Sequence, residues 1–370
     1  MTSRERVRLA LAHKEADRIP FDLGSRSSAI EEEAYDALKG FLKIEKPTRR
    51  FIRSHAELDR EVIELFGIDT DYVRAIPPAS WRTDGKDELY VDKWNVPWRK
   101  KEGALYYELD TCPLRGMDPG EILKQAWPPL VSERMVREMA VQARRLHDEG
   151  EAALFTDFIG AGVFERAWYL RGFEDFAVEL MVEKSFAHAY LEKILQRQIE
   201  AYQTILDAVG PYIEGVWITD DIATQDSLMF SPETYREMIK PYQKRLLEYL
   251  RSRNMKVIFH TCGAVYPLIP DLLEIGVEII HPLQLNARGM ETAKLKKEFG
   301  RDLVFWGGGC NIEVLQTGSA ADVHDEVKRR IGDLAPGGGF VFTPTHCIQP
   351  HTAPENVMAM IDALREFGAY

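Results

Sequence analysis

The strongest constraint on the fold is a unit that recurs along the chain. A short apolar run, rich in β-branched and aromatic residues, ends in Gly, Asp, His or Cys and leads into a longer amphipathic segment. Eight such runs occur, at residues 19–24, 71–77, 153–160, 216–222, 257–263, 278–284, 303–309 and 340–346. Strands that alternate with helices and are apolar throughout are typical of a parallel sheet covered on both faces. Eight units close a (β/α)8 barrel, so we predict an α/β TIM barrel.

A doubly wound open sheet is the structural competitor, and the absence of a GxGxxG motif after the first run weighs against it. Several segments between the runs carry helix signals. These are the periodic segments 130–149 and 184–209, an N-cap at Ser231 before Pro232, a capping box of Ser319 with Asp322, and Pro354 at the start of the last helix. Pro241 is expected to kink or end its helix.

One span, about residues 79–128, interrupts the alternation. Within it residues 89–109 (LYVDKWNVPWRKKEGALYYEL) predict two strands around a Lys-Lys-Glu-Gly turn. A length of 370 residues allows one or two domains, and a barrel can account for all of it. We therefore predict a single domain, 1–370, with an N-terminal extension and an inserted β-hairpin.

Composition excludes several classes of function. A net charge of -12 argues against a nucleic-acid surface, and a mean hydropathy of -0.28 without an apolar run near about 18 residues argues against a membrane span. Four cysteines are too few for a disulfide scaffold. The N-terminus is charged from its third residue and lacks the apolar core of a signal peptide. We expect a cytoplasmic protein with reduced thiols, and a homodimer remains open.

Three of the four cysteines follow predicted strands at the end where barrels place their active sites: Cys262, Cys310 and Cys347. His260 and Cys262 alternate along one strand, so both side chains point the same way, about 6–7 Å apart. Thiolates with imidazole favour zinc. Buried cysteines acting as small apolar residues are the alternative, and Cys112, in the insertion, is expected to be an ordinary thiol.

Other polar groups fall at the same end. Asp220 and Asp221 end the fourth run, where they are candidates for acid–base chemistry, for support of a metal-bound histidine, or for a structural cap. Glu165 is a catalytic candidate, although an acidic residue also suits a first helical turn. His281 and Gln284 are candidates for lining a cofactor site or for core hydrogen bonds. Gly308 and Gly309 would let a bulky cofactor approach the backbone.

The chain also resembles a known family. The resemblance is carried by residues 259–284 (FHTCGAVYPLIPDLLEIGVEIIHPLQ), 305–319 (FWGGGCNIEVLQTGS) and 337–360 (GGGFVFTPTHCIQPHTAPENVMAM), with support from residues 6–24, 162–176 and 217–244. These segments resemble the uroporphyrinogen decarboxylase-like superfamily and, within it, the zinc-dependent, corrinoid-linked methyltransferases. The likeness spans nearly the whole chain, and its specific element is the His-x-Cys with a distant cysteine.

The resemblance implies a barrel whose zinc binds and activates a methyl-accepting thiol or another small methyl donor or acceptor. His260 and Cys262 are then ligands, with Cys310 and Cys347 competing for the remaining places. In thiol-methylating members the last cysteine comes one position earlier than Cys347, so His346 is an alternative ligand. Asp220, Asp221 and Glu165 would handle protons. The corrinoid (cobalamin) is expected on a partner carrier protein, because the carrier motif DxHxxG is absent here.

Two other functions remain as alternatives. A metal-free lyase of the uroporphyrinogen decarboxylase type would need an arginine-rich N-terminal motif of the form RQAGRY. The corresponding stretch, DLGSRSSAI, keeps only Arg26. A non-catalytic barrel with a structural zinc is the other alternative, because a barrel fold alone does not define a reaction.

Overall fold

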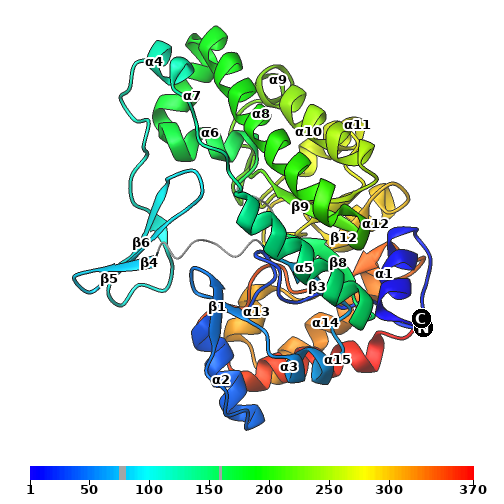
Figure 1. Cartoon of the computed structure of the whole chain (residues 1–370). Helices are drawn as coiled ribbons and strands as arrows, with labels where there is room; N and C mark the ends of the chain where they lie inside the picture. Colours follow the sequence, from blue (N-terminus) through cyan, green and yellow to red (C-terminus); the bar gives the residue numbers. More distant parts are fainter. Residues whose placement is uncertain (75–80, 158–160) are drawn as a thin grey trace.

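The structure is a computed structural model that describes residues 1–74, 81–157 and 161–370. At its centre is a curled parallel sheet of seven strands, in the order β13-β12-β11-β10-β9-β8-β3 (Figure 1). The strands are β3 (Thr70–Val73), β8 (Ala153–Thr156), β9 (Gly215–Thr219), β10 (Lys256–His260), β11 (Ile279–His281), β12 (Val304–Trp306) and β13 (Phe340–Val341). Each lies within or beside one of the predicted runs, and the α/β class is confirmed. Residues 75–77 and 158–160 of two runs lie outside the described residues.

The first predicted run, residues 19–24, is not a full strand. It forms a single parallel β-bridge between Phe21 and Phe342. The Asp22 N–H donates to the Phe342 carbonyl at 2.8 Å, and the Asp69 N–H, just before β3, donates to the Phe21 carbonyl at 2.7 Å. Residues 20–22 therefore hydrogen bond to both edges of the seven-stranded sheet. The pairing is short because Pro20 has no N–H to donate and the chain turns at Gly24, where φ is +112°.

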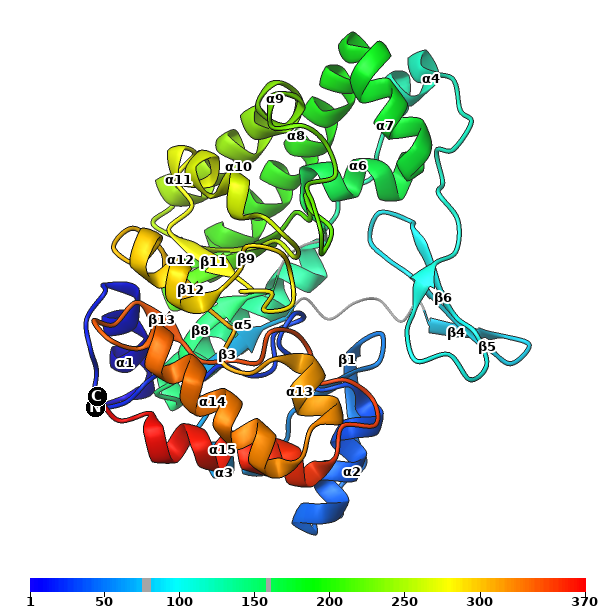
Figure 2. The ribbon, with the colours of Figure 1, turned by 180° about the vertical axis from the view of Figure 1, so that it is seen from behind.

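The helices surround the sheet, and most of them follow strands and cover its outer face (Figure 2). They are α1 (Ser3–Leu11), α2 (Glu32–Leu42), α3 (Arg60–Phe66), α4 (Pro119–Lys124), α5 (Glu133–Glu149), α6 (Val163–Arg171), α7 (Phe173–Val182), α8 (Lys184–Val209), α9 (Pro232–Thr234), α10 (Lys240–Ser252), α11 (Ile269–Glu274), α12 (Thr292–Phe299), α13 (Ile312–Thr317), α14 (Ala320–Leu334) and α15 (Pro354–Phe367). No helix in the described ranges is long and apolar enough to cross a membrane.

The predicted helix signals are confirmed. Ser231 accepts the Thr234 N–H, and Ser319 forms a reciprocal capping box with Asp322 before α14. The helix around Pro241 is interrupted as expected. Tyr235–Ile239 form a π-helical turn, and α10 starts at Lys240 with Pro241 in its first turn.

The inner face of the sheet packs around large side chains. Phe155, Trp217 and Trp306 are fully buried there, and Val7 and Ala10 of α1 join the same apolar cluster. The Arg4 N–H donates to the carbonyl of Glu151, just before β8, at 2.8 Å. Helix α1 therefore covers the end of the sheet where strands begin, and the opposite end, where strands finish, is left for a site.

Residues 81–109 form a four-stranded antiparallel sheet in place of the single predicted hairpin. Its strands are β4 (Trp81–Asp84), β5 (Asp87–Val91), β6 (Pro97–Lys100) and β7 (Glu108–Leu109). The expected Lys-Lys-Glu-Gly turn joins β6 to β7. A second turn follows β5, because the Asp92 carboxylate accepts the N–H groups of Trp94 and Val96. A separate hairpin of β1 (Arg49–Ile52) and β2 (His55–Glu57) lies near this inserted sheet (Figure 1).

Candidate metal and substrate site

Three side chains at the carboxyl ends of the strands form a cluster suited to a metal ion: His260, Cys262 and His346. One ligand atom from each lies within 4.8 Å of the other two. His260 Nε2 is 3.4 Å from Cys262 Sγ. His260 ends β10 and Cys262 follows two residues later on the same face, as strand alternation predicts. His346 comes from the loop after β13.

Cys310 and Cys347, which we expected as ligands, point elsewhere. Cys310 is fully buried in the apolar core, and its thiol faces the Asn311 carbonyl at 3.7 Å. The Cys347 thiol donates to the Arg26 carbonyl at 3.3 Å. The chain bends at Thr345 and His346, so the loop directs His346 toward the cluster while Cys347 points toward Arg26. Among the described residues, the one candidate metal cluster includes neither cysteine.

His281 supports His260 from behind. The two Nδ1 atoms are 2.7 Å apart and the rings stack with centroids 4.9 Å apart. One Nδ1 must donate to the other. When His260 Nδ1 carries the proton, its Nε2 lone pair is free to face the cluster. His281, which we expected to line a cofactor site, is fully buried and is not among the residues lining the large cavity described below.

The loop after β10 is held by two acceptors. The Cys262 N–H donates to Asp221 Oδ1 at 2.7 Å, and the Gly263 N–H donates to Gln284 Oε1 at 2.7 Å. Gln284 therefore fixes the loop that carries Cys262. It is not among the residues lining the large cavity described below.

Gly308 and Gly309, also expected near a cofactor, pack against side chains. A Cβ on Gly308 would lie 2.8 Å from the Leu283 Cβ, and one on Gly309 would lie 2.5 Å from Phe342 Cδ2. These glycines allow the backbone after β12 to pack closely. Neither lines the cavity.

Glu165, on α6, lies beside the cluster with a nearly buried carboxylate. Tyr169 Oη donates to it at 2.7 Å and Thr219 Oγ1 at 2.9 Å. Burial, reinforced by the charge of Asp221, raises the pKa of Glu165 to about 7. Burial also raises the pKa of Asp221 to about 6. Both residues face the cavity and both titrate near neutral pH, which suits proton transfer.

Asp220 is a helix cap. It accepts the backbone N–H groups of Phe164 and Glu165, at 3.1 and 2.7 Å, and the side-chain amide of Gln243 at 2.9 Å. The cap forms because Gly162 lets α6 approach β9; a Cβ there would lie 2.0 Å from the Thr219 carbonyl oxygen. Asp220 is 2% exposed. These contacts agree with the structural cap that the sequence also allowed for Asp220.

Burial keeps the cluster uncharged in the absence of a cation. It lowers the pKa of His260 well below its usual value and that of His346 to about 4. It raises the pKa of the Cys262 thiol, and the charge of Asp221 adds to this effect. Neutral imidazoles offer lone pairs, and a bound divalent cation would favour the thiolate over the thiol. The donor set, two imidazoles and one cysteine, fits zinc with one position left for a further ligand.

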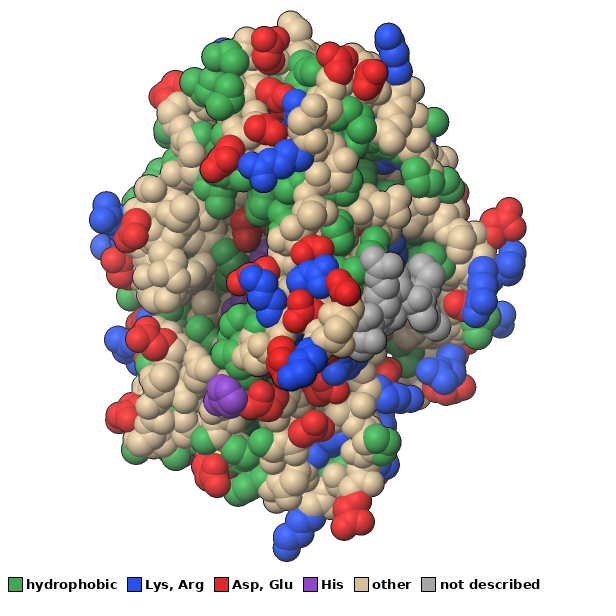
Figure 3. All heavy atoms as spheres, turned by 90° about the vertical axis from the view of Figure 1, so that its left-hand side faces the viewer, with side chains coloured by type: hydrophobic (Ala, Val, Ile, Leu, Met, Phe, Trp, Pro, Cys, Tyr) green, Lys and Arg blue, Asp and Glu red, His purple; other side chains and the backbone are tan. Residues whose placement is uncertain are grey.

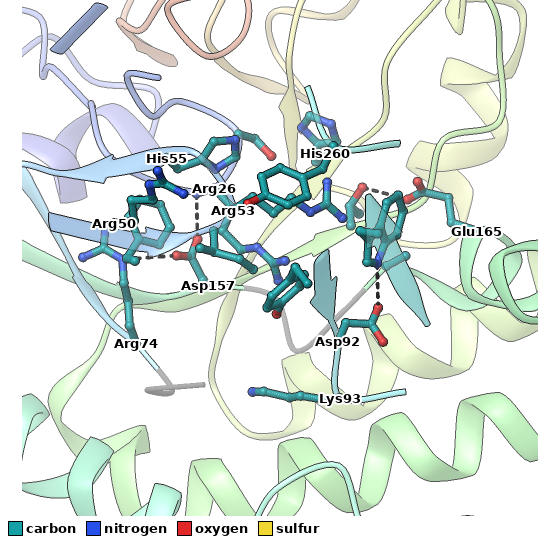
Figure 4. Close-up of a pocket in the computed structure, with 18 of the residues that line it drawn as sticks. Arg26, Arg50, Arg53, His55, Arg74, Asp92, Lys93, Asp157, Glu165 and His260 are labelled. Carbon is teal, nitrogen blue, oxygen red and sulfur yellow. Dashed lines mark hydrogen bonds and ion pairs between the residues drawn. The ribbon is translucent and has the colours of Figure 1, made fainter. Parts of the chain in front are cut away.

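His260 and His346 open onto a cavity of about 750 Å³. A hollow with histidine side chains is visible on the face shown in Figure 3. The opposite wall comes from the β1–β2 hairpin and the inserted sheet. It carries the aromatic residues Phe51, Tyr90, Trp94, Trp98, Tyr106 and Tyr107. It also carries the basic residues Arg50, Arg53 and Lys93 (Figure 4). Sequence reasoning did not find this wall. Its only signal was the density of basic and aromatic residues at 49–55 and 90–99.

The fold is a curled parallel α/β sheet with a cluster of two histidines and a cysteine at its carboxyl end. Comparison with known proteins identifies the family. The model of the uroporphyrinogen decarboxylase (URO-D) family matches residues 129–367. The chain belongs to this family.

Characterised relatives fall into two groups. A methylcobamide:CoM methyltransferase, MtaA, of Methanosarcina barkeri is 25% identical over 221 residues, covering 60% of this chain and 57% of that protein. A methylated-thiol–coenzyme M methyltransferase of Methanosarcina mazei is 24% identical over 55% of this chain and 51% of that protein. A uroporphyrinogen decarboxylase of Thermus thermophilus is 24% identical over 72% of this chain and 80% of that protein. The matches to the methyltransferases span little more than half of their length.

Among solved structures, a methyltransferase from Methanosarcina mazei superimposes over 99% of both chains with a TM-score of 0.68 and 18% sequence identity. This likeness confirms the fold.

Proposed function

We propose that the protein is a zinc-dependent methyltransferase. It moves a methyl group between a small molecule, a thiol or another acceptor or donor, and a corrinoid carried by a partner protein. The observation that carries the proposal is the cluster of His260, Cys262 and His346 at the floor of a large cavity. The similarity to two corrinoid- or thiol-linked methyltransferases supports it.

The donor set agrees with the chemistry. Three protein ligands, with a fourth position facing a cavity, are typical of catalytic zinc sites, whereas structural zinc sites use four protein ligands. Zinc bound there would lower the pKa of a coordinated thiol and keep the sulfur nucleophilic near neutral pH.

The chain's own residues would prepare that position. His281 orients His260, and the loop hydrogen bonds from Cys262 to Asp221 and from Gly263 to Gln284 hold Cys262 in place. Glu165 and Asp221 face the cavity with raised pKa values, so either can accept the proton that a substrate thiol or hydroxyl loses. A cysteine ligand needs a reducing compartment, and we place the protein in the cytoplasm on that ground.

The metal-free decarboxylase is the weaker alternative. A metal-free mechanism does not explain why two histidines and a cysteine lie together beside the cavity. The N-terminal stretch also keeps one arginine, Arg26, of the arginine-rich motif that a decarboxylase of this family would use. A non-catalytic zinc barrel is disfavoured because the cluster faces a cavity of about 750 Å³.

Methyl transfer tests the proposal. Zinc-loaded protein is mixed with methylcobalamin and 2-mercaptoethanol, and loss of methylcobalamin absorbance is followed together with the methylated thiol. We expect transfer that stops on chelation and falls at least about 100-fold in Cys262→Ser, while the matched Cys310→Ser variant keeps its rate. Transfer that is indifferent to chelation and to Cys262→Ser would overturn the assignment. So would decarboxylation of uroporphyrinogen by metal-free protein.

A further inference from the structure

Helix α7 carries more apolar residues than this chain buries. Its sequence, FEDFAVELMV, is apolar at seven of ten positions. Of these seven residues only Phe176 and Leu180 are buried. A helix on a protein surface typically has one apolar face, whereas a helix that is apolar around its whole circumference is covered by other protein. Helix α7 therefore has a second apolar face that the described part of the chain leaves uncovered.

The uncovered face includes Phe173, Val178, Met181 and Val182, whose exposed fractions are 43%, 59%, 58% and 69%. They are four of the ten large apolar side chains that are exposed in the described residues, and they lie on a single helix of ten residues. Figures 1 and 2 place α7 at the outer edge of the molecule, away from the sheet. Single exposed apolar residues are common, but a contiguous group of them marks an interaction surface.

A small cavity adjoins this face. Its volume is about 310 Å³, and its lining includes Phe173, Ala177 and Met181 of α7 with Met229 and Phe230 of the segment before α9. Among the described residues it shares none of its lining with the cavity at the metal cluster. Ala177 lies four residues from both Phe173 and Met181, so the three side chains share one side of the helix and the small one leaves a gap between the two large ones. The cavity therefore offers a recess for a side chain that comes from outside.

The face is complementary to itself when two copies of α7 pack antiparallel about a two-fold axis. If the axis passes at the level of residue 179, residues that lie equally far before and after this position face each other across it. Met181 then lies opposite Ala177 of the second copy, so a large side chain meets the recess beside a small one. The axis repeats this contact, and both recesses are filled in the same register.

The same register pairs opposite charges. Glu174 and Lys184 each lie five positions from residue 179, so Glu174 of one copy lies opposite Lys184 of the other. Their side chains are 85% and 46% exposed, and each contacts one oppositely charged residue of its own chain. Asp175 and Glu183 lie about 100° or more around the helix from Glu174, outside this face. An acidic group at one end and a basic group at the other is the charge order that antiparallel pairing requires.

We propose that α7 is the two-fold interface of a homodimer, with a second copy of this chain as its occupant. Each Met181 fills the recess beside Ala177 of the other copy, and Val178 packs near the axis. Glu174 pairs with Lys184 at both edges of the interface. A two-fold interface closes on itself and stops at two chains. This face is separate from the candidate metal site, and the inference does not rest on the proposed function.

Sedimentation equilibrium of the full chain is the first test. Wild type is compared with Val178→Lys, Met181→Lys and the control Val141→Lys, because Val141 is 72% exposed on α5. We expect wild type and Val141→Lys to dimerise at about 100 µM chain. The two α7 variants should dimerise at least about tenfold more weakly, because each buries an unpaired ammonium group against apolar surface. Wild type that stays monomeric at this concentration would overturn the proposal, whatever other protein the face then binds. A dimer that neither α7 variant weakens would overturn it as well.

Exchange of the two charges is the second test, and it is specific to a second copy in this register. Glu174→Lys and Lys184→Glu are measured singly and together at low salt. Each single variant places like charges opposite each other and should weaken the dimer about threefold or more, whereas the double variant restores opposite charges and should recover the affinity. Recovery in the double variant supports the contact across the axis. A double variant that dimerises no better than the weaker single variant would overturn the antiparallel pairing.

Discussion

At the scale of single residues, the contact between His260 and His281 bears on how His260 could bind a metal ion. Their 2.7 Å Nδ1–Nδ1 contact allows one proton between them. Metal binding through His260 Nε2 would require that proton to sit on His260, and His281 Nδ1 would then be its acceptor. The fully buried position of His281 explains why it does not itself reach the cavity.

Replacing His281 by Phe keeps the ring stacking and removes the acceptor. We expect zinc affinity to fall about 10- to 100-fold because His260 loses its orienting partner. Competition with a chelating dye measures the dissociation constant. His188→Phe is the matched control, since His188 hydrogen bonds to Tyr242 on the helical layer, away from the cluster. An unchanged zinc affinity in His281→Phe would show that His281 does not support the ligand.

Glu165 should leave a signature in the pH dependence of stability. Its pKa rises from 4.5 to about 7 on folding, mainly through burial. A carboxyl with a raised folded pKa stabilises the protein fully below its unfolded pKa, and this contribution is lost as the pH rises toward 7. Relative to wild type, Glu165→Gln should therefore gain stability between pH 4.5 and pH 7, by at most about 3 kcal/mol.

Urea unfolding at a series of pH values measures this difference. Glu174→Gln is the control, because it makes the same substitution at a side chain that is 85% exposed on α7. A Glu165→Gln curve that runs parallel to that of wild type would mean that Glu165 does not titrate in this range.

Residue patterns predicted only part of the site. His260 and Cys262 could be paired because strand alternation fixes their direction over two residues. The choice between His346 and Cys347 could not be made, because both lie in a loop whose direction depends on the bridge between Cys310 and Pro344. Cys310 lies in the apolar core, and its position after three glycines in the sequence did not reveal that burial. Arg53 and Lys93 carried no motif.

At the scale of elements, the junction between β9 and α6 joins the site to the scaffold. The Asp220 carboxylate caps the first turn of α6, whose N-cap residue Gly162 has no side chain to do so. Glu165 then lies in the first turn and Tyr169 one turn later, so the cap positions both groups beside the metal cluster.

Asp220→Ala should lower the free energy of unfolding by about 2 kcal/mol, since the buried N–H groups of Phe164 and Glu165 lose their acceptor. The neighbouring Asp221→Ala removes one N–H acceptor and should cost less. Denaturant unfolding and metal content are measured together, and Asp220→Ala is expected to keep its zinc. An Asp220→Ala protein of normal stability that cannot bind zinc would assign Asp220 to the site and not to the helix.

The inserted sheet contains one turn that the sequence predicts and one that it does not. One turn was predicted from Lys-Lys-Glu-Gly, and the structure has that turn between β6 and β7. The preceding turn depends on two hydrogen bonds in which the Asp92 carboxylate accepts backbone N–H groups. A pattern of apolar and polar positions does not predict such bonds. The result is a four-stranded sheet that supplies a cavity wall in place of a peripheral hairpin.

At the scale of the whole molecule, the parallel sheet could be predicted because each strand is an apolar run followed by a helix. The single β-bridge formed by residues 19–24 was not predicted, although Pro20 and the turn at Gly24 limit the pairing of this run. Asp22 shows why this region matters. Its buried carboxylate accepts from Thr70, Tyr72, Ser28 and Trp306, which joins the first run to β3 and β12.

The same organisation brings the proposed zinc ligands together at one end of the sheet. One end of the sheet is covered by α1, the other carries a three-ligand cluster, and the inserted sheet encloses the space above that cluster. The fold places the two histidines and the cysteine together although they come from the end of β10, the loop after it and the loop after β13. Catalysis by a metal with an open position depends on that convergence.

Zinc content with zinc K-edge X-ray absorption tests this claim most directly. We expect one zinc per chain with a single sulfur ligand and nitrogen or oxygen ligands besides, and a second sulfur on addition of a thiol substrate. Cys262→Ser should lose the protein sulfur, and Cys310→Ser and Cys347→Ser should leave the spectrum unchanged. Protein without stoichiometric zinc after metal loading, or a zinc with two or more protein sulfurs that depend on Cys310 or Cys347, would contradict it.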